Sequence, residues 1–269
     1  MISKAPWLCA ILSLAVATGA LAAPPPTVEL DELTFTELRA EIEAGKTTII
    51  IPVGGTEQSG PHIALGKHNA RVRALSRKIA LALGNALVAP VIAYVPEGGV
   101  NPPTAHMRYP GTITVPDATF EKVVEYAARS FRLHGFRDIV LIGDHGGYQK
   151  NLKLVAERLD REWGGTGVRV HAIGEYYQTA GVAYAQALKS RGFREDEIGT
   201  HAGLADTSLM LAIDPRLVRS ERLSSGKESG HAEGVSGDPR RSSAELGQFG
   251  VDAIVAATVT AIKKAVAQH

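Results

Sequence analysis

The chain has 269 residues, a formal net charge of +1 at neutral pH and one cysteine, Cys9. Its basic residues are scattered and form no stripe or patch, so the sequence offers no electrostatic footprint for nucleic-acid binding. The length suits one large domain with a sizeable core. No internal repeat or linker divides it.

The first 22 residues have the pattern of a secretory signal peptide. Lys4 gives a short positive region, the apolar run 7–17 is too short for a comfortable membrane span, and residues 20–22 form a small-x-small cleavage pattern. The alternative is a retained anchor helix. We expect cleavage and a mature domain of residues 23–269 that is periplasmic or secreted. Because Cys9 leaves with the leader, any metal site must use His, Asp and Glu.

Strand-like and helix-like segments alternate along the rest of the chain. Short apolar, β-branched runs predict buried strands, and apolar residues at helical spacing predict helices. The predicted strands are 47–53, 87–94, 138–142 and 168–173, and the predicted helices are 35–44, 69–83, 118–134, 149–163, 176–190, 202–212 and 244–266. This order predicts a single-domain α/β/α layered sandwich with a mostly parallel sheet.

Two polar loops directly follow predicted strands. Glu57 comes after TIIIPV, His145 comes after DIVLIGD, and His68 closes the first loop before a helix. Sites in parallel α/β sheets form beyond the carboxyl ends of the strands, so these side chains could converge. Two imidazoles and a carboxylate would leave a metal position open for water. The alternative is that both histidines only stabilise a helix start and a turn.

Other histidines are open to two interpretations. His62, between a proline and an isoleucine, suits loop packing as well as substrate contact. In the segment THAGLADTSLML, His201 and Asp206 could move protons or bind metal, or the segment could simply cap a helix. His106 lies in the Gly- and Pro-rich loop 95–114 and could line the mouth of a site. A loop of that length is usually functional or disordered.

Taken in order, these segments resemble the creatininase family of metal-dependent amidohydrolases. PVGGTEQSGPHIALGKH is similar to the family motif P-V-G-S-x-E-Q-H-G-P-H-L-P-x-x-x-D, GDHGGY to N-G-H-G-G-N, and HAGLADTS to H-A-G-x-x-E-T-S. HMRYPGTITV and GVSGDPRRSSAELG also look like family segments. Order and spacing agree over residues 33–265, so the chain is identified as a member of this family.

The resemblance implies a single α/β domain with helices on both sides of the sheet, usually two divalent ions, hydrolysis of cyclic or linear amide C–N bonds, and homo-oligomers, commonly hexamers. Two ligand positions depart from the family pattern. The histidine two residues after Glu57 is replaced by Ser59, and the metal-bridging carboxylate falls at His68. A neutral imidazole has one lone pair and does not readily bridge two ions.

We therefore expect one divalent ion per chain instead of two, with zinc favoured over manganese or iron. By resemblance, its ligands would be Glu57, His68 and His145. Asp206, which stands where the family has a glutamate, is a fourth candidate ligand.

The predicted activity is hydrolysis of an amide C–N bond in a small cyclic amide by metal-activated water. His201 would stabilise the oxyanion or protonate the leaving nitrogen, and Asp206 would complete the metal shell or accept a proton. Candidate substrate-lining residues are His62, His106 and Ser59. The alternatives are a lactone or ester hydrolase and a degenerate, non-catalytic binding protein. Expected partners are a small-molecule substrate and further copies of the chain, without nucleic acid or, after processing, membrane.

Overall fold

The computed structural model describes residues 26–224 and 230–267. The predicted leader 1–22, with Cys9, lies outside the described residues. Within the described part, one sheet contains four parallel strands in the order β2-β1-β3-β4. The strands are β1 (Thr48–Val53), β2 (Ala86–Val88), β3 (Asp138–Gly143) and β4 (Arg169–Ala172). The central strand β1 is buried along its whole length.

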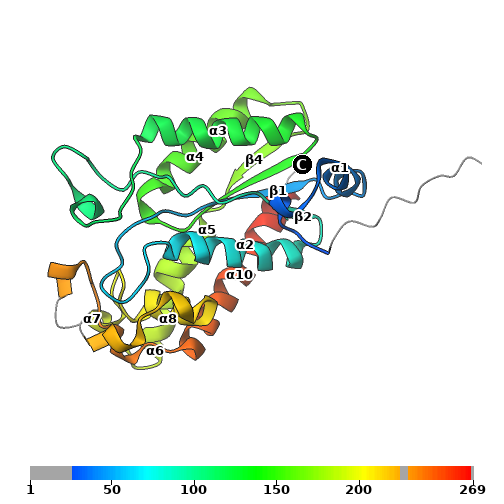
Figure 1. Ribbon diagram of the computed structural model, residues 1–269. Helices are drawn as coiled ribbons and strands as arrows, with labels where there is room; N and C mark the ends of the chain where they lie inside the picture. Colours follow the sequence, from blue (N-terminus) through cyan, green and yellow to red (C-terminus); the bar gives the residue numbers. More distant parts are fainter. Residues whose placement is uncertain (1–25, 225–229, 268–269) are drawn as a thin grey trace, which may run out of the picture.

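Helices cover both faces of the sheet (Figure 1). One face carries α3 and α4, with α1 packed against the same core, and the other carries α2, α5, α6, α8 and α10. The helices are α1 (Phe35–Glu43), α2 (Lys67–Leu83), α3 (Asp117–Leu133), α4 (Gln149–Glu162), α5 (Glu175–Gln178), α6 (Tyr184–Ser190), α7 (Glu195–Ile198), α8 (Leu204–Ile213) and α10 (Ala244–Val266).

The two cores follow from the alternation of side chains along each strand. Ile50 of β1 packs in the core formed with α2 and α10, whereas Ile49 and Ile51 pack in the core formed with α3 and α4. Successive residues of a strand point to opposite faces of its sheet. A strand that is apolar at every position must therefore be covered on both sides, as the run TIII predicts.

The predicted α/β class is confirmed, and the differences are local. The predicted strand 87–94 ends at Val88, because Pro90 has no N–H for a ladder hydrogen bond. The predicted helix 176–190 is helical but contains a π-helical turn, Thr179–Ala183, between α5 and α6. Helix α2 begins at Lys67, which places His68 in its first turn.

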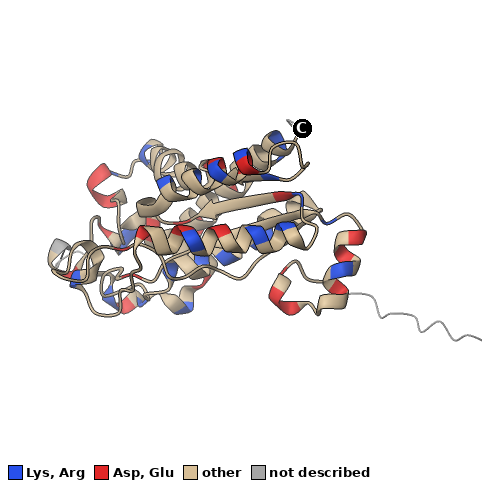
Figure 2. Cartoon of the chain, turned by 90° about the horizontal axis from the view of Figure 1, so that it is seen from above, with Lys and Arg blue, Asp and Glu red and all other residues tan. Residues whose placement is uncertain are grey.

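The charged side chains are mixed in sign over the surface. Figure 2 shows Lys and Arg interspersed with Asp and Glu along the helices. Among the residues that the structure describes, no helix is both long enough and apolar enough to cross a membrane.

A buried tyrosine ties together the loops that follow β1 and β3. The Tyr148 hydroxyl donates to the carbonyl oxygens of Val53, at 2.8 Å, and Gly54, at 2.5 Å. It accepts from the backbone N–H groups of Asp144 and His145, at 3.1 and 3.0 Å. The hydroxyl thus fixes two loops at the carboxyl edge of the sheet relative to each other.

We expect Tyr148→Phe to lower the free energy of unfolding by about 1–3 kcal/mol, because it leaves buried backbone groups without a partner. Urea denaturation followed by circular dichroism measures this change. Tyr126→Phe is the matched control, since Tyr126 is 62% exposed. The control should change stability by no more than about 0.5 kcal/mol. Equal losses in the two variants would contradict the role of the buried hydroxyl.

Candidate metal site

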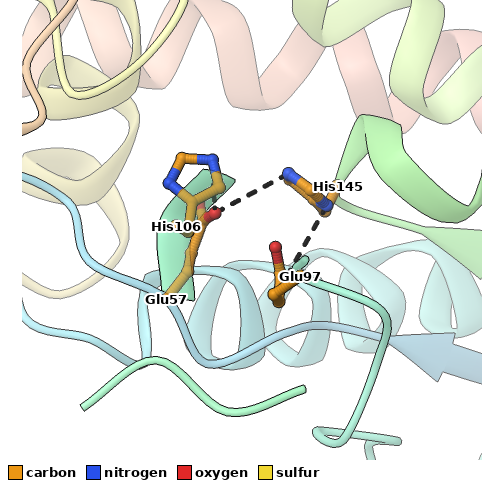
Figure 3. A group of neighbouring side chains, drawn as sticks. All are labelled: Glu57, Glu97, His106 and His145. Carbon is orange, nitrogen blue, oxygen red and sulfur yellow. Dashed lines mark ion pairs between the residues drawn. The ribbon is translucent and has the colours of Figure 1, made fainter. Parts of the chain in front are cut away.

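Four potential metal ligands converge at the carboxyl edge of the sheet. Glu57 comes from the loop after β1, Glu97 and His106 from the long segment after β2, and His145 from the loop after β3. One ligand atom from each lies within 4.8 Å of the other three. Figure 3 shows the four side chains pointing toward one another. We call these four residues the four-ligand group.

Three of the four carboxylate oxygens of this group are buried without a hydrogen-bond partner among the described residues. Glu57 Oε2 lies 3.1 Å from His106 Nε2 and 3.7 Å from His145 Nε2. His145 Nδ1 lies 3.6 Å from Glu97 Oε1. Within the described part of the chain, Glu57 Oε2 and both carboxylate oxygens of Glu97 accept no hydrogen bond. Such buried oxygens are costly, and a divalent cation among them would satisfy them.

The pKa values in the four-ligand group are also consistent with a bound cation. Burial, together with the charge of Glu57, raises the pKa of Glu97 to about 9. Burial lowers the pKa of His145 to about 4, and burial also lowers the pKa of His106. A bound cation favours ionised carboxylates and neutral imidazoles, which keep a lone pair for it. Two imidazoles and two carboxylates are donors that zinc, manganese and iron all accept.

A glycine makes room for Glu97. Gly55 has a φ of +151°, and a Cβ at this position would lie 2.7 Å from Glu97 Oε1. A side chain would therefore displace the carboxylate, so the second glycine of the PVGG stretch, Gly55, is needed for the close approach.

Two non-glycine residues beside site histidines adopt a left-handed backbone. Ala105 precedes His106 and has a φ of +47°, and Ala202 follows His201 and has a φ of +52°. This conformation is uncommon for residues with a Cβ and is found preferentially at functional sites. The surrounding fold therefore holds both histidines in a specific orientation.

The other oxygen of Glu57 belongs to a buried network of charges. Glu57 Oε1 lies 2.7 Å from His68 Nε2 and 3.4 Å from Lys67 Nζ. His68 Nδ1 lies 2.5 Å from Asp144 Oδ1. Both ring nitrogens of His68 therefore face carboxylates, one of Glu57 and one of Asp144. The structure favours a bridging role for His68, and its assignment as a metal ligand stays a prediction.

Asp206 lies in the same network. Its Oδ2 accepts from Lys67 Nζ at 2.9 Å and from the backbone N–H of Ala202 at 3.0 Å, and its Oδ1 accepts from Arg71 at 2.8 Å. Arg71 also donates to Asp144. Burial raises the pKa of Asp206, but Lys67 and Arg71 outweigh it and hold the pKa well below its ordinary value. Its roles as ligand and proton acceptor stay predictions.

His201 lies close to the carboxylate of Glu57. His201 Nε2 lies 2.9 Å from the backbone carbonyl oxygen of Gln58 and 3.1 Å from the side-chain Nε2 of Gln58, and His201 Nδ1 lies 3.7 Å from Glu57 Oε1. Burial lowers the pKa of His201 to about 3, so the imidazole is neutral at pH 7. A neutral imidazole carries one proton, so one of its two ring nitrogens keeps a lone pair.

Two other predicted site residues are buried beside this region. His62 is fully buried, and its Nε2 lies 3.0 Å from the Ala202 carbonyl oxygen and 3.1 Å from Thr207 Oγ1. Ser59 is 1% exposed, and its hydroxyl has no hydrogen-bond partner within the described residues. Neither residue lines the cavity described next.

A cavity of about 400 Å³ opens beside the site. His106 and His145 of the four-ligand group line it, together with His201 and Asp206. The remaining lining residues are Lys67, His68, Arg71, Asp144, Gly146, Tyr177, Ala180, Gly181, Ala185, Ile198, Gly199, Thr200, Ala205 and Leu209. The cavity combines polar groups with a wall of small and aliphatic side chains, which suits a small molecule.

Comparisons with known proteins agree with this geometry. The model of the creatininase family, described as creatinine amidohydrolase, matches residues 31–262. Creatinine amidohydrolase of Pseudomonas putida is 31% identical over 208 residues, which cover 73% of this chain and 76% of that protein. The mycofactocin precursor peptide peptidase of Mycobacterium ulcerans is 26% identical, with coverage of 79% and 83%.

A solved structure is similar over nearly its whole length. A glutamate-to-glutamine variant of creatininase, described as the Zn-Zn type, superimposes with a TM-score of 0.71. It is 26% identical to this chain, and the match covers 90% of this chain and 99% of that one.

The sequence does not single out Glu97, Lys67, Arg71 or Asp144. A signal existed for Glu97, because it follows the second predicted strand as Glu57 follows the first. In the sequence, Lys67 lies in the loop before the predicted helix 69–83 and Arg71 is a polar position of that helix, and only the fold shows that both are buried.

We expect Glu97→Gln to weaken zinc binding at least about tenfold, since loss of even an outer-shell partner has an effect of that size. Titration of metal-free protein with zinc against a competing chelator measures the affinity. Glu157→Gln is the control, because its carboxylate lies on the exposed side of α4 with Lys153. Unchanged affinity in Glu97→Gln would rule out Glu97 as a ligand.

His106→Asn and His68→Asn distinguish the two candidate ligand sets. If the four-ligand group binds the ion, His106→Asn should lower zinc content, while His68→Asn should mainly reduce stability by breaking a buried carboxylate bridge. Elemental mass spectrometry and thermal melting provide the two measurements. Loss of zinc from His68→Asn alone would favour the ligand set of Glu57, His68 and His145.

Proposed function

The chain belongs to the creatininase family and is a metal-dependent amide hydrolase, and we propose that its substrate is a small, cyclic amide. We further propose that the four-ligand group holds one divalent ion, with zinc preferred. The proposal rests on one observation above all: three buried carboxylate oxygens without donors face two imidazoles with depressed pKa values, beside a cavity of about 400 Å³.

When bound, a divalent ion supplies water of lowered pKa and a Lewis acid for a carbonyl oxygen. The protein residues then position and transfer protons. His201 lines the cavity, is neutral at pH 7 and directs Nδ1 toward Glu57. Its neutral ring can accept a proton and return it to a leaving nitrogen. Asp206 also lines the cavity, and its ion pairs with Lys67 and Arg71 keep it negatively charged at the polar end of the cavity.

The remainder of the cavity supports a compact substrate. Ala180, Gly181 and Ala185 provide small side chains, and Ile198 and Leu209 provide apolar surface. This surface would bind the carbon skeleton of a small ring, while the polar wall would bind its amide. The same geometry accepts a lactone, so the substrate experiment includes both classes.

Zinc-loaded protein should hydrolyse at least one member of a panel of cyclic amides, linear amides and lactones. His145→Ala should lose at least about a hundredfold in kcat/KM, because it removes a ligand of the ion that activates water. Release of product measured by mass spectrometry follows the reaction. His134→Ala, which changes an exposed histidine beyond the end of α3, serves as the control.

Full metal content and full turnover in His145→Ala would refute this mechanism. Preferential turnover of lactones would replace the amide by an ester-type substrate at the same site.

We also propose that residues 1–22 direct export and that the mature chain forms homo-oligomers, possible hexamers among them, as the family resemblance implies. Cell fractionation with N-terminal sequencing tests the export. Light scattering after size-exclusion chromatography tests the assembly.

A further inference from the structure

Lys67 is a buried cation at the centre of the site. Its side chain is 1% exposed, and Nζ lies 2.9 Å from Asp206 Oδ2 and 3.4 Å from Glu57 Oε1. It also lines the cavity beside His201. The ammonium group therefore joins the carboxylate of the loop after β1 to that of α8.

Local structure disfavours a lysine at this position. Lys67 is the first residue of α2, where the unpaired N–H groups and the helix dipole favour negative charge. Burial of an ammonium group is costly in addition. Its position is therefore explained by the two carboxylates, since breaking such a buried pair would leave them without a counter-charge.

The atoms around the ammonium group are themselves metal-ligand types. Without Lys67, Glu57 Oε1 and Asp206 Oδ2 would face the same space. His201 Nδ1 lies 3.7 Å from that Glu57 oxygen. Two carboxylate oxygens and an imidazole nitrogen form a donor set for a divalent ion, which would lie on the opposite side of Glu57 from the four-ligand group.

We propose that the ammonium group of Lys67 is a built-in cation that occupies the place of a second divalent ion and limits the chain to one. This inference rests on the proposed function, in which the four-ligand group holds the first ion. Lys67 acts as a charge-positioning residue: it neutralises Glu57 Oε1 and Asp206 without taking up a metal ion.

Metal stoichiometry tests this inference. The wild-type chain, Lys67→Ala and Lys46→Ala are dialysed against zinc and analysed by elemental mass spectrometry. We expect about one ion per chain in the wild type and about two in Lys67→Ala. Lys46→Ala, which removes a lysine paired with Glu41 outside the site, should match the wild type.

Thermal melting gives a second measurement, independent of turnover. Lys67→Ala should melt below the wild type without zinc and should gain more from added zinc, because a ligand that binds only the folded state stabilises it. Lys67→Ser keeps a short donor near Asp206 and replaces the alanine variant if that variant does not fold. It should also acquire a second ion.

The outcomes separate this inference from the proposed function. One ion in the wild type and one in both Lys67 variants would overturn the role of Lys67 while leaving the four-ligand group intact. No ion in the wild type but one in Lys67→Ala would overturn the proposed four-ligand site and support Lys67 as the cation that excludes metal.

Discussion

The site depends on one fully buried carboxylate, that of Glu57, at the carboxyl end of the central strand. Its two oxygens face different surroundings. One faces the imidazoles of His106 and His145, and the other faces Lys67 and His68. Burial raises the pKa of Glu57, but Lys67 and His68 outweigh it and hold the pKa far below its ordinary value. Glu57 therefore keeps a negative charge, which the groups around its two oxygens balance unequally.

The negative charge is balanced differently on the two sides of the Glu57 carboxylate. On one side, Lys67 and Arg71 pair with Glu57, Asp144 and Asp206, so the carboxylates there have counter-charges within the chain. On the other side, the Glu57 and Glu97 oxygens have no donors within the described residues. This asymmetry is the physical basis for the proposed single metal ion, in a family for which a related structure is described as the Zn-Zn type.

Much of the fold could be predicted from periodicity, because the strands and long helices are set by local patterns of apolar residues. Single residues made some predicted element boundaries wrong: Pro90, for example, ends β2 earlier than predicted. Part of the site was also predictable. The rule that sites follow parallel strands identified Glu57 and His145, and both belong to the four-ligand group. Glu97 was not identified, although it follows the second predicted strand and the same rule applies to it.

The sequence by itself determined the α/β class, the family and the edge of the sheet where chemistry would gather. Each of these rests on residue order and on strand geometry, which act over short distances along the chain. Only the tertiary structure decided how the charged residues pair. Lys67 and Arg71 carry no mark of a site in the sequence, yet they meet Asp206 in a buried network because α2 and α8 pack on the same face of the sheet. Charge pairing depends on distance and burial, and both are fixed only when the layers close.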